Sequence, residues 1–292
     1  MKPAPFELER PDSVEAALAM LTDEEIEARP LAGGQSLVPL MNFRLSRPER
    51  LISLNHLTEL ASIGTDGDEL VVGAMVRQHA AERSPVVADW CPLLRQALRH
   101  VAHPPIRNRG TIGGSIAHAD PSAELPALAV ALQARLVLRS VGGQRTVDAR
   151  HFFVGPYETT MVPGELLTEI RLPRTRTGQG HGVAEVARRH GDFALAGAMA
   201  AVQVGDGQVT AADLAFFGVG SRPLAADAVS QLVGTEPTEA AVEEVARQAA
   251  AAVEPVGDQH ASSRFRAHLT AVVARRALAD ALSAAAGGGD GR

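Results

Sequence analysis

The 292-residue chain contains a single cysteine, Cys91. One thiol rules out a disulfide framework, a zinc site held by cysteines and an iron–sulfur cluster bound by this chain alone, because each needs several cysteines. Cys91 is expected to be a small buried residue, with no sign of a reactive thiol. If electrons pass through this protein, an organic cofactor must carry them.

Long apolar runs and clusters of basic residues are also missing. No stretch of about 18 residues is apolar and uncharged, so no membrane-spanning helix is predicted, and the N-terminus lacks the apolar core of a signal peptide. The net charge of −6, with dispersed lysine and arginine, argues against nucleic acid as a partner. Hydrophobic residues still make up 46% of the chain, which predicts a globular protein, and the cytoplasm is its expected location.

The N-terminal part alternates between short extended and helical patterns. The predicted elements, in chain order, are a strand at 6–8, a helix at 14–21, a strand at 31–32, a helix beginning at Ser36 and a strand at 51–54. Asp12 and Ser13 provide an N-cap for the first helix, with an acidic residue three positions after Asp12. This order predicts a small parallel α/β unit.

The remainder is expected to mix antiparallel strands with helices. Polar or glycine-rich turns between apolar strands, such as Thr65–Asp68 and Gly142-Gly143, indicate hairpins. Residues 104–122 are predicted to be a polar, glycine-rich loop, and 173–182 a linker. The other predicted elements are strands at 62–64, 70–73, 135–139, 145–147, 166–172, 183–187, 195–204 and 209–217, and helices at 90–101, 123–132, 237–253 and 262–282.

Two glycine pairs stand out, in AGGQS at 32–36 and TIGGS at 111–115. Glycine permits positive φ and leaves backbone N–H groups open to a close ligand, and a helix beginning at Ser36 would add the positive end of its dipole. Together the segments could hold a ligand with two linked phosphates, whereas one pair alone is more often a simple turn. Neither contains GxGxxG or a P-loop lysine, so neither a Rossmann nor a Walker site is predicted.

The sequences around both pairs resemble the FAD-binding medium subunits of the xanthine dehydrogenase and carbon monoxide dehydrogenase family, the molybdenum hydroxylases. The resemblance rests on LAGGQSLVPLMNFRLSRPERLISLN from residue 31 and HPPIRNRGTIGGSIAHADPSAELPALAVAL from residue 103. The family's order is also followed by three later segments, GELLTEIRLP, ARRHGDFALAGAMAAV and ASSRFRAHLTAVVARRAL. The resemblance therefore covers nearly the whole chain.

This resemblance implies an α+β protein with the FAD-binding fold of p-cresol methylhydroxylase. It implies an N-terminal FAD-binding subdomain at 1–56, a middle FAD-binding subdomain at 57–176 and a C-terminal domain of antiparallel sheet and helices at 177–285, while the glycine-rich composition predicts a disordered tail at 286–292. FAD would lie extended in the cleft between the first two.

The resemblance also assigns roles to individual residues. Glu124 stands where relatives place an acid that reaches FAD hydroxyls, and Leu167 where they place an apolar residue near the flavin. Gln35 and Ser115 replace the His and Asn of many relatives but keep hydrogen-bonding capacity. The implied cofactor-binding residues are Leu31, Ala32, Gly33, Gly34, Gln35, Ser36, Leu37, Val38, Thr111, Ile112, Gly113, Gly114, Ser115, Glu124 and Leu167.

By resemblance, this chain is one subunit of a larger enzyme. Substrate would be hydroxylated at a molybdenum–pterin centre on a large subunit, and electrons would pass through two 2Fe-2S clusters on a small subunit to this FAD and then to an external acceptor. A dimer of heterotrimers is the implied assembly. Two alternatives are a self-contained flavin-dependent oxidase, for which no acid–base set is evident, and a module that has lost its cofactor, against which the intact glycines argue.

Several other polar residues are interpreted as structural. His100, His103 and His118 flank the second glycine pair but lack the spacing of a metal site, so no metal ligand is predicted. Tyr157 could approach the flavin ring, and Glu185 lies near a lysine position of some relatives, but neither is assigned a role. No catalytic residue is predicted. Neither the substrate of the large subunit nor the final electron acceptor follows from this sequence.

Overall fold

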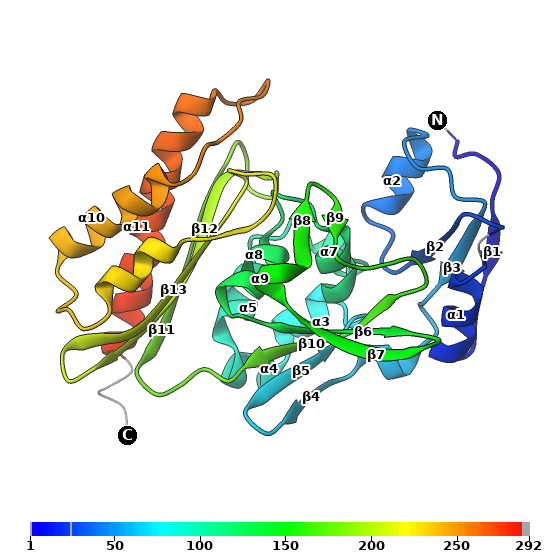
Figure 1. The fold of residues 1–292 in the computed structure, drawn as a ribbon, viewed down its shortest axis with the longest axis horizontal. Coiled ribbons are helices and arrows are strands. Elements are labelled where there is room, and N and C mark those ends of the chain that lie inside the picture. Colours follow the sequence, from blue (N-terminus) through cyan, green and yellow to red (C-terminus); the bar gives the residue numbers. More distant parts are fainter. Residues whose placement is uncertain (1, 24, 288–292) are drawn as a thin grey trace.

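The computed structural model describes residues 2–23 and 25–287, and this described chain is an α+β protein built on three main sheets (Figure 1). The sheet near the N-terminus is parallel, whereas the middle and C-terminal sheets are antiparallel. Helices of the middle part lie between the middle and C-terminal sheets and pack against both. Each sheet therefore has helices on at least one face.

The N-terminal sheet is the parallel α/β unit that the sequence predicts. It consists of β1 (Glu7–Glu9), α1 (Val14–Leu21), β2 (Ala28–Leu31), α2 (Leu37–Asn42) and β3 (Arg50–Ser53), with the strands in the order β1–β3–β2. Helix α1 begins where predicted, but its N-cap is Ser13 and not Asp12. The Ser13 hydroxyl accepts a hydrogen bond from the N–H of Ala16 at 3.1 Å.

The middle sheet confirms two predicted hairpins. Its strands, in spatial order, are β4 (Ile63–Asp66), β5 (Glu69–Gly73), β10 (Leu166–Pro173), β6 (Arg135–Ser140) and β7 (Gly143–Asp148). Ile170 on β10 lies opposite Val72 on β5 and Leu136 on β6, and all three side chains are fully buried. They belong to an apolar core that continues into the helices below the sheet.

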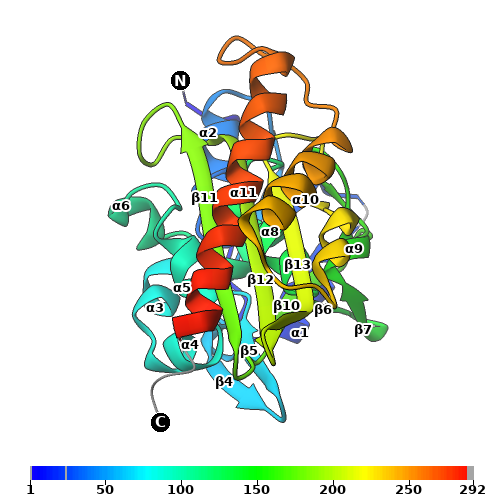
Figure 2. The same cartoon turned by 90° about the vertical axis from the view of Figure 1, so that its left-hand side faces the viewer.

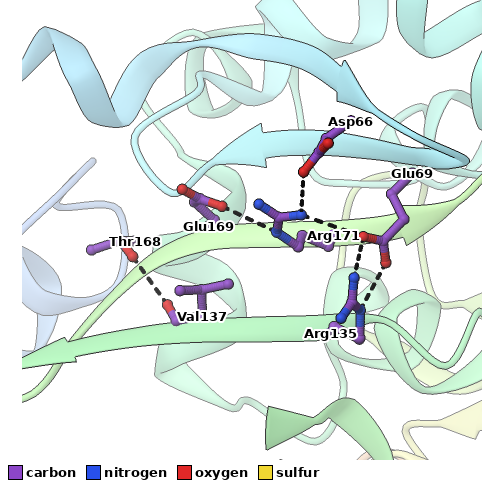
Figure 3. Close-up of polar contacts among 7 residues, drawn as sticks. All are labelled: Asp66, Glu69, Arg135, Val137, Thr168, Glu169 and Arg171. Atoms are coloured by element: carbon purple, nitrogen blue, oxygen red, sulfur yellow. Dashed lines mark hydrogen bonds and ion pairs between the residues drawn. The ribbon is translucent and has the colours of Figure 1, made fainter. Parts of the chain in front are cut away.

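The other face of this sheet carries an ion-pair network (Figure 3). Arg171 alternates with the buried Ile170 and so points the opposite way. Its guanidinium lies 2.8 Å from Asp66, 3.4 Å from Glu69 and 3.3 Å from Glu169, and Arg135 also binds Glu69. Partly exposed pairs like these contribute about 1 kcal/mol or less each. The network therefore holds strand ends in register without dominating stability.

The helices of the middle part show that the predicted helix at 90–101 has the wrong bounds. They are α3 (Gln78–Arg83), α4 (Pro85–Trp90), α5 (Pro92–Leu98), α6 (Pro104–Arg107), α7 (Ile112–His118), α8 (Glu124–Ala131) and α9 (Ala149–Phe152), with a 3-10 turn at Thr58–Ala61 before them and a short hairpin of β8 (Phe153–Gly155) and β9 (Glu158–Thr159) after them. Of the residues predicted to form one helix at 90–101, Trp90 ends α4, Cys91 separates the two helices, and α5 covers residues 92–98. Proline is favoured at the first position of a helix, and Pro92 begins α5 there.

A second correction concerns residues 104–122, which were predicted to form a loop. They contain α6 and α7, and Thr111 caps α7 by accepting a hydrogen bond from the Gly114 N–H at 3.0 Å. The two glycines hide the helical pattern because glycine weakens a helix. Here burial against β5 and β10 stabilises α7 despite them.

The C-terminal sheet is covered by two helices on its outer face (Figure 2). Its elements are β11 (Gln179–Ala187), β12 (Ala194–Gly205), β13 (Gln208–Phe217), β14 (Leu224–Ala225), a 3-10 turn at Asp227–Leu232, α10 (Glu239–Ala251) and α11 (Ser263–Gly287). The predicted linker is shorter than expected, since residues 179–182 already belong to β11. The predicted disordered tail is also wrong at 286–287, where α11 continues, and its remainder lies outside the described residues.

Small residues allow α11 to approach β11 closely. A Cβ placed on Gly182 would lie 2.1 Å from the Ala277 carbonyl oxygen, and one on Gly180 would lie 2.0 Å from that of Ala281. The other face of the sheet, which carries Met199 and Phe217, packs into the core shared with the middle helices. Within the described chain, no helix is both long enough and apolar enough to cross a membrane.

Candidate cofactor-binding site

A cleft of about 480 Å³ opens between the N-terminal sheet, the middle helices and the turn that joins β11 to β12. Of the predicted cofactor-binding residues, those that line it are Ala32, Gly33, Gly34, Gln35, Ser36, Leu37, Thr111, Gly113, Gly114, Ser115, Glu124 and Leu167. The structure thus brings together segments that are far apart in sequence.

Three predicted residues do not line the cleft. Leu31 is the last residue of β2, and Val38 is exposed on α2. Ile112 is buried, and its N–H donates to the Val76 carbonyl at 3.0 Å. The side chains of Leu31 and Val38 nevertheless lie near Gly34, where a built Cβ would meet them at 3.4 and 3.2 Å.

The first glycine segment, residues 32–36 with Leu37, provides unused hydrogen-bond donors. Within the described chain, no protein acceptor is paired with the backbone N–H groups of residues 33–37. Gly34 adopts φ +74°, a conformation that glycine takes without strain. The Gln35 side chain folds back and donates to the Gly33 carbonyl at 3.0 Å, which fixes the loop. Successive free N–H groups of this kind suit an anion such as a phosphate.

The second glycine segment has a different role from the one its sequence suggests. Its glycines lie in the first turn of α7, and its N–H groups are already used: Gly113 donates to Ala74, Gly114 to the Thr111 hydroxyl and Ser115 to the Thr111 carbonyl. Neither Gly113 nor Gly114 has positive φ. This segment therefore shapes the wall of the cleft, and the unused N–H donors come from the first segment.

Close packing explains why these positions are glycine. A Cβ on Gly33 would lie 2.3 Å from the Arg109 carbonyl oxygen, and one on Gly113 would lie 2.4 Å from the Ala74 Cβ. A Cβ on Gly114 would crowd the capping Thr111 hydroxyl at 2.6 Å. The two segments can line one narrow cleft only because these side chains are absent.

A polar clasp, formed by Asn55 and Arg77, ties the two sides of the cleft together. Arg77 donates to the Asn55 side-chain oxygen at 2.6 Å and also to the Arg109 carbonyl. Asn55 in turn donates to the Ala32 carbonyl at 3.2 Å. Sequence reasoning missed this clasp: Asn55 ends the first family-like segment but was given no role, and Arg77 lies outside those segments.

The far end of the cleft is acidic. Glu124, the first residue of α8, is buried, and burial together with the nearby Glu185 carboxylate raises the Glu124 pKa to about 8. The Glu185 side chain is only 6% exposed, its Oε2 has no hydrogen-bond partner, and the His100 Nδ1 lies 3.4 Å from that oxygen. Sequence reasoning left Glu185 without a role, whereas the structure places it beside Glu124.

Tyr157 and His118 form a neighbouring group at the cleft wall. Their ring centroids are 5.0 Å apart, and the Tyr157 hydroxyl donates to Asp120 at 3.4 Å. Burial lowers the pKa of His118, so this ring is neutral near neutral pH. His118 and Asp120 line the cleft, whereas Tyr157 stands outside it with φ +60°.

Further lining residues were not predicted. Gln78 is buried, and among the described residues its side-chain Oε1 has no hydrogen-bond partner, whereas its backbone N–H donates to the Gly110 carbonyl at 2.9 Å. Ile106, on α6, also lines the cleft. Asp192 lines the cleft with Gly191 and Phe193, in the turn between β11 and β12. For Gly191, Asp192 and Phe193, the only sequence signal was the short polar turn that they form between two long strands.

The cleft as a whole fits an extended dinucleotide. It offers free N–H donors for phosphates at one end, hydroxyls of Ser36 and Ser115 along its wall, and apolar surface at Leu167. Leu167 is positioned by a bulge after it, where the Thr168 hydroxyl donates to the Val137 carbonyl at 3.2 Å (Figure 3). The acidic end suits hydroxyl groups.

Comparisons with known proteins agree along the whole chain. Residues 4–175 match the family described as FAD binding domain in molybdopterin dehydrogenase, and residues 182–281 match the CO dehydrogenase flavoprotein C-terminal domain. The chain is 37% identical to the 6-hydroxypseudooxynicotine dehydrogenase complex subunit alpha of Paenarthrobacter nicotinovorans, over 97% of this chain and 96% of that protein. It is 38% identical to the carbon monoxide dehydrogenase medium chain of Afipia carboxidovorans, over 95% of this chain and 97% of that protein.

A solved structure shows the same fold. Carbon monoxide dehydrogenase from Hydrogenophaga pseudoflava, in a form lacking the Mo-pyranopterin moiety of its molybdenum cofactor, matches with a TM-score of 0.95 and 38% identity. The match covers 97% of this chain and 99% of that chain.

Proposed function

The chain belongs to the family of FAD-binding medium subunits of molybdenum hydroxylases, and we propose that it passes electrons from iron–sulfur clusters on a partner subunit through FAD to an external acceptor. One observation carries the proposal: the two glycine segments, about 80 residues apart, line one cleft with free N–H donors at its end. The family matches over both parts of the chain support it.

In this proposal the predicted residues hold FAD in an extended form. The N–H groups of residues 33–37 bind the pyrophosphate, and the hydroxyls of Ser36 and Ser115 assist along the ribityl chain. Glu124 binds cofactor hydroxyls, and Leu167 packs near the flavin. Leu31 and Val38 pack beside Gly34, and Ile112 anchors the second segment through the Val76 carbonyl.

The residues of this chain orient the cofactor and restrict water. Bound FAD supplies the ability to accept electrons one at a time and to release them in pairs. Apolar lining at Met161, Leu166 and Leu167 keeps water from part of the cleft. Cys91 takes no part, because burial raises the pKa of its thiol to about 12 and holds it protonated.

We extend the proposal to the assembly. A small subunit with two 2Fe-2S clusters and a large subunit with a molybdenum–pterin centre complete the enzyme, as a dimer of heterotrimers in the cytoplasm. The domain limits 1–56, 57–176 and 177–285 are supported by the three sheets, each of which falls within one of them. The relatives' names refer to compounds as different as 6-hydroxypseudooxynicotine and carbon monoxide, which supports the proposal that another subunit determines the substrate.

The test is to purify the complex through an affinity tag on this chain and to measure its native mass, FAD, iron and molybdenum together. We expect two further subunits, one FAD per copy of this chain and iron matching two 2Fe-2S clusters. A complex carrying Gly34→Val and Gly114→Val should keep its iron and molybdenum but lose most FAD. A flavin-containing chain that purifies without partners or metals would contradict the proposal.

A further inference from the structure

The acidic end of the cleft contains more carboxyl groups than its surroundings can neutralise. Glu124 lines the cleft at the start of α8, Asp120 lies four residues before it, and Glu185 approaches from β11. Glu185 is nine-tenths buried with an unpaired Oε2. A buried carboxylate without a hydrogen-bond donor is costly, so this arrangement needs a compensating proton or cation.

No permanent cation supplies that charge. Within the described chain, neither Glu124 nor Glu185 forms an ion pair with an arginine or lysine, and the basic group that contacts Glu185 is His100, two residues after the end of α5. Burial lowers the pKa of His118, on α7, and lowers that of His181, on β11, to about 4, so both rings are neutral near neutral pH.

Other charged groups around α8 are already paired or lie elsewhere. Asp213 on β13 and Arg150 on α9 bind each other at 2.8 Å. Asp213 also accepts from Gln133, just beyond the C-terminal end of α8, so this pair is remote from Glu124 at the other end. In the turn after β11, Arg188 lies 3.6 Å from Asp192. The carboxyl group of Asp120 accepts from the Ser122 N–H and from Tyr157.

We propose that Glu124, with Glu185 beside it, is a proton-loading site: once Glu124 has ionised, the cleft takes up one more proton when the bound flavin is reduced. The inference rests on the proposed function, since the electrons come from the iron–sulfur partner. Burial disfavours the ionised form of Glu124, and the nearby Glu185 adds to this effect. His100, whose side chain is 36% exposed, links the pair to solvent.

The charges balance as follows. Two electrons from the partner's clusters reduce the flavin, which itself binds one proton and thereby gains one net negative charge. Where Glu124 has lost its proton, that negative charge raises its proton affinity, and Glu124 takes a proton from solvent. Glu124 is neither oxidised nor reduced, and it returns its proton to solvent when the electrons leave for the acceptor. Above about pH 8 the cleft thus keeps its total charge through a reduction cycle.

The experiment is a spectroelectrochemical titration of the flavin in the intact complex, followed at the flavin absorption band over a range of pH. In the wild type, the plot of midpoint potential against pH should show a break near pH 8, above which one more proton is bound per two electrons. In Glu185→Gln the break should move down by roughly one pH unit or more, because the neighbouring negative charge is gone. In Glu124→Gln the break should be absent.

Glu243→Gln is the matched control, because Glu243 is exposed on α10, away from the cleft. In this variant the break in the plot of midpoint potential against pH should stay where it is in the wild type. A break that does not move in Glu185→Gln would show that Glu124 titrates alone, and no break in the wild type would show that neither residue loads a proton; either result overturns the inference.

A second measurement does not depend on the variants. Above pH 8, the reduced-minus-oxidised infrared spectrum of the wild-type complex should gain intensity in the C=O stretch of a protonated carboxyl group. No gain there would also overturn the inference. Substrate reduction of the flavin in the same sample separates this failure from a failure of the proposed function: if substrate reduces the flavin but the proton signals are absent, only the proton-loading site is wrong.

Discussion

At the scale of single residues, the glycines of the cleft serve different purposes. Gly34 allows a positive φ, Gly33 allows one segment to touch the Arg109 backbone, and Gly114 leaves space for the Thr111 cap of α7. The sequence predicted that these positions matter, but it attributed them all to positive φ and contact with phosphate. Close approach of two distant segments could not be predicted, because it depends on their packing in three dimensions.

The packing role of Gly33 can be tested with Gly33→Ala. The added methyl group would overlap the Arg109 carbonyl oxygen, so we expect a loss of about 1–3 kcal/mol in the free energy of unfolding and reduced FAD content. Denaturant titration and the flavin-to-protein ratio measure the two effects. Gly64→Ala is the control, since a Cβ there meets nothing within 4 Å and both quantities should stay unchanged. Equal behaviour of the two variants would contradict the packing role.

Glu124 predicts a pH dependence of stability. Its pKa is raised from 4.5 to about 8 in the folded protein, so its protonated form is favoured by folding. The stabilisation is therefore complete below about pH 4.5 and is lost as the pH rises through 8. In Glu124→Gln this loss, of the order of a few kcal/mol at most, should disappear from the plot of unfolding free energy against pH. In Glu243→Gln the slope of unfolding free energy against pH should match that of the wild type. A wild-type slope in Glu124→Gln would contradict the assignment of this pH dependence to Glu124.

At the scale of elements, the sequence predicted most strands and both C-terminal helices. Alternation in β10, the long apolar run of β12 and regular apolar spacing in α10 made them recognisable. Helix α7 was missed because its first turn carries Gly113 and Gly114, and burial outweighs their low helix propensity. Glu185 stayed without a role for a related reason: its position beside Glu124 results from the packing of β11 against α5 and of α8 against the neighbouring strand β12, which no local pattern reports.

The contact between β11 and α11 gives a prediction at this scale. In Gly182→Ala the new methyl group would overlap the Ala277 carbonyl oxygen, so α11 must move away from the sheet. We expect the free energy of unfolding to fall by about 1–3 kcal/mol. FAD content should stay normal, because α11 packs on the outer face of the sheet. Gly142→Ala, which makes only an ordinary contact at 3.7 Å, should leave the denaturation midpoint in place; an equal shift in both variants would argue against close packing.

At the scale of the whole molecule, the cleft depends on how the N-terminal sheet meets the middle part. The Asn55–Arg77 clasp joins the two sides. In Arg77→Gln we expect FAD affinity to fall roughly tenfold or more, since a charge-assisted hydrogen bond contributes about 1.5–3 kcal/mol. Titration of flavin-depleted complex with FAD measures this change. Arg276→Gln, exposed on α11, should bind as the wild type does; unchanged affinity in Arg77→Gln would show that the clasp does not organise the cleft.

The central claim is that this subunit carries electrons away from chemistry performed on another subunit. The direct test is anaerobic addition of substrate to the complex after its FAD has been removed. The account predicts that substrate still bleaches the iron–sulfur absorption, while turnover with the acceptor is lost until FAD is restored. Rapid reduction of FAD by substrate on the isolated chain, without any partner subunit, would contradict it.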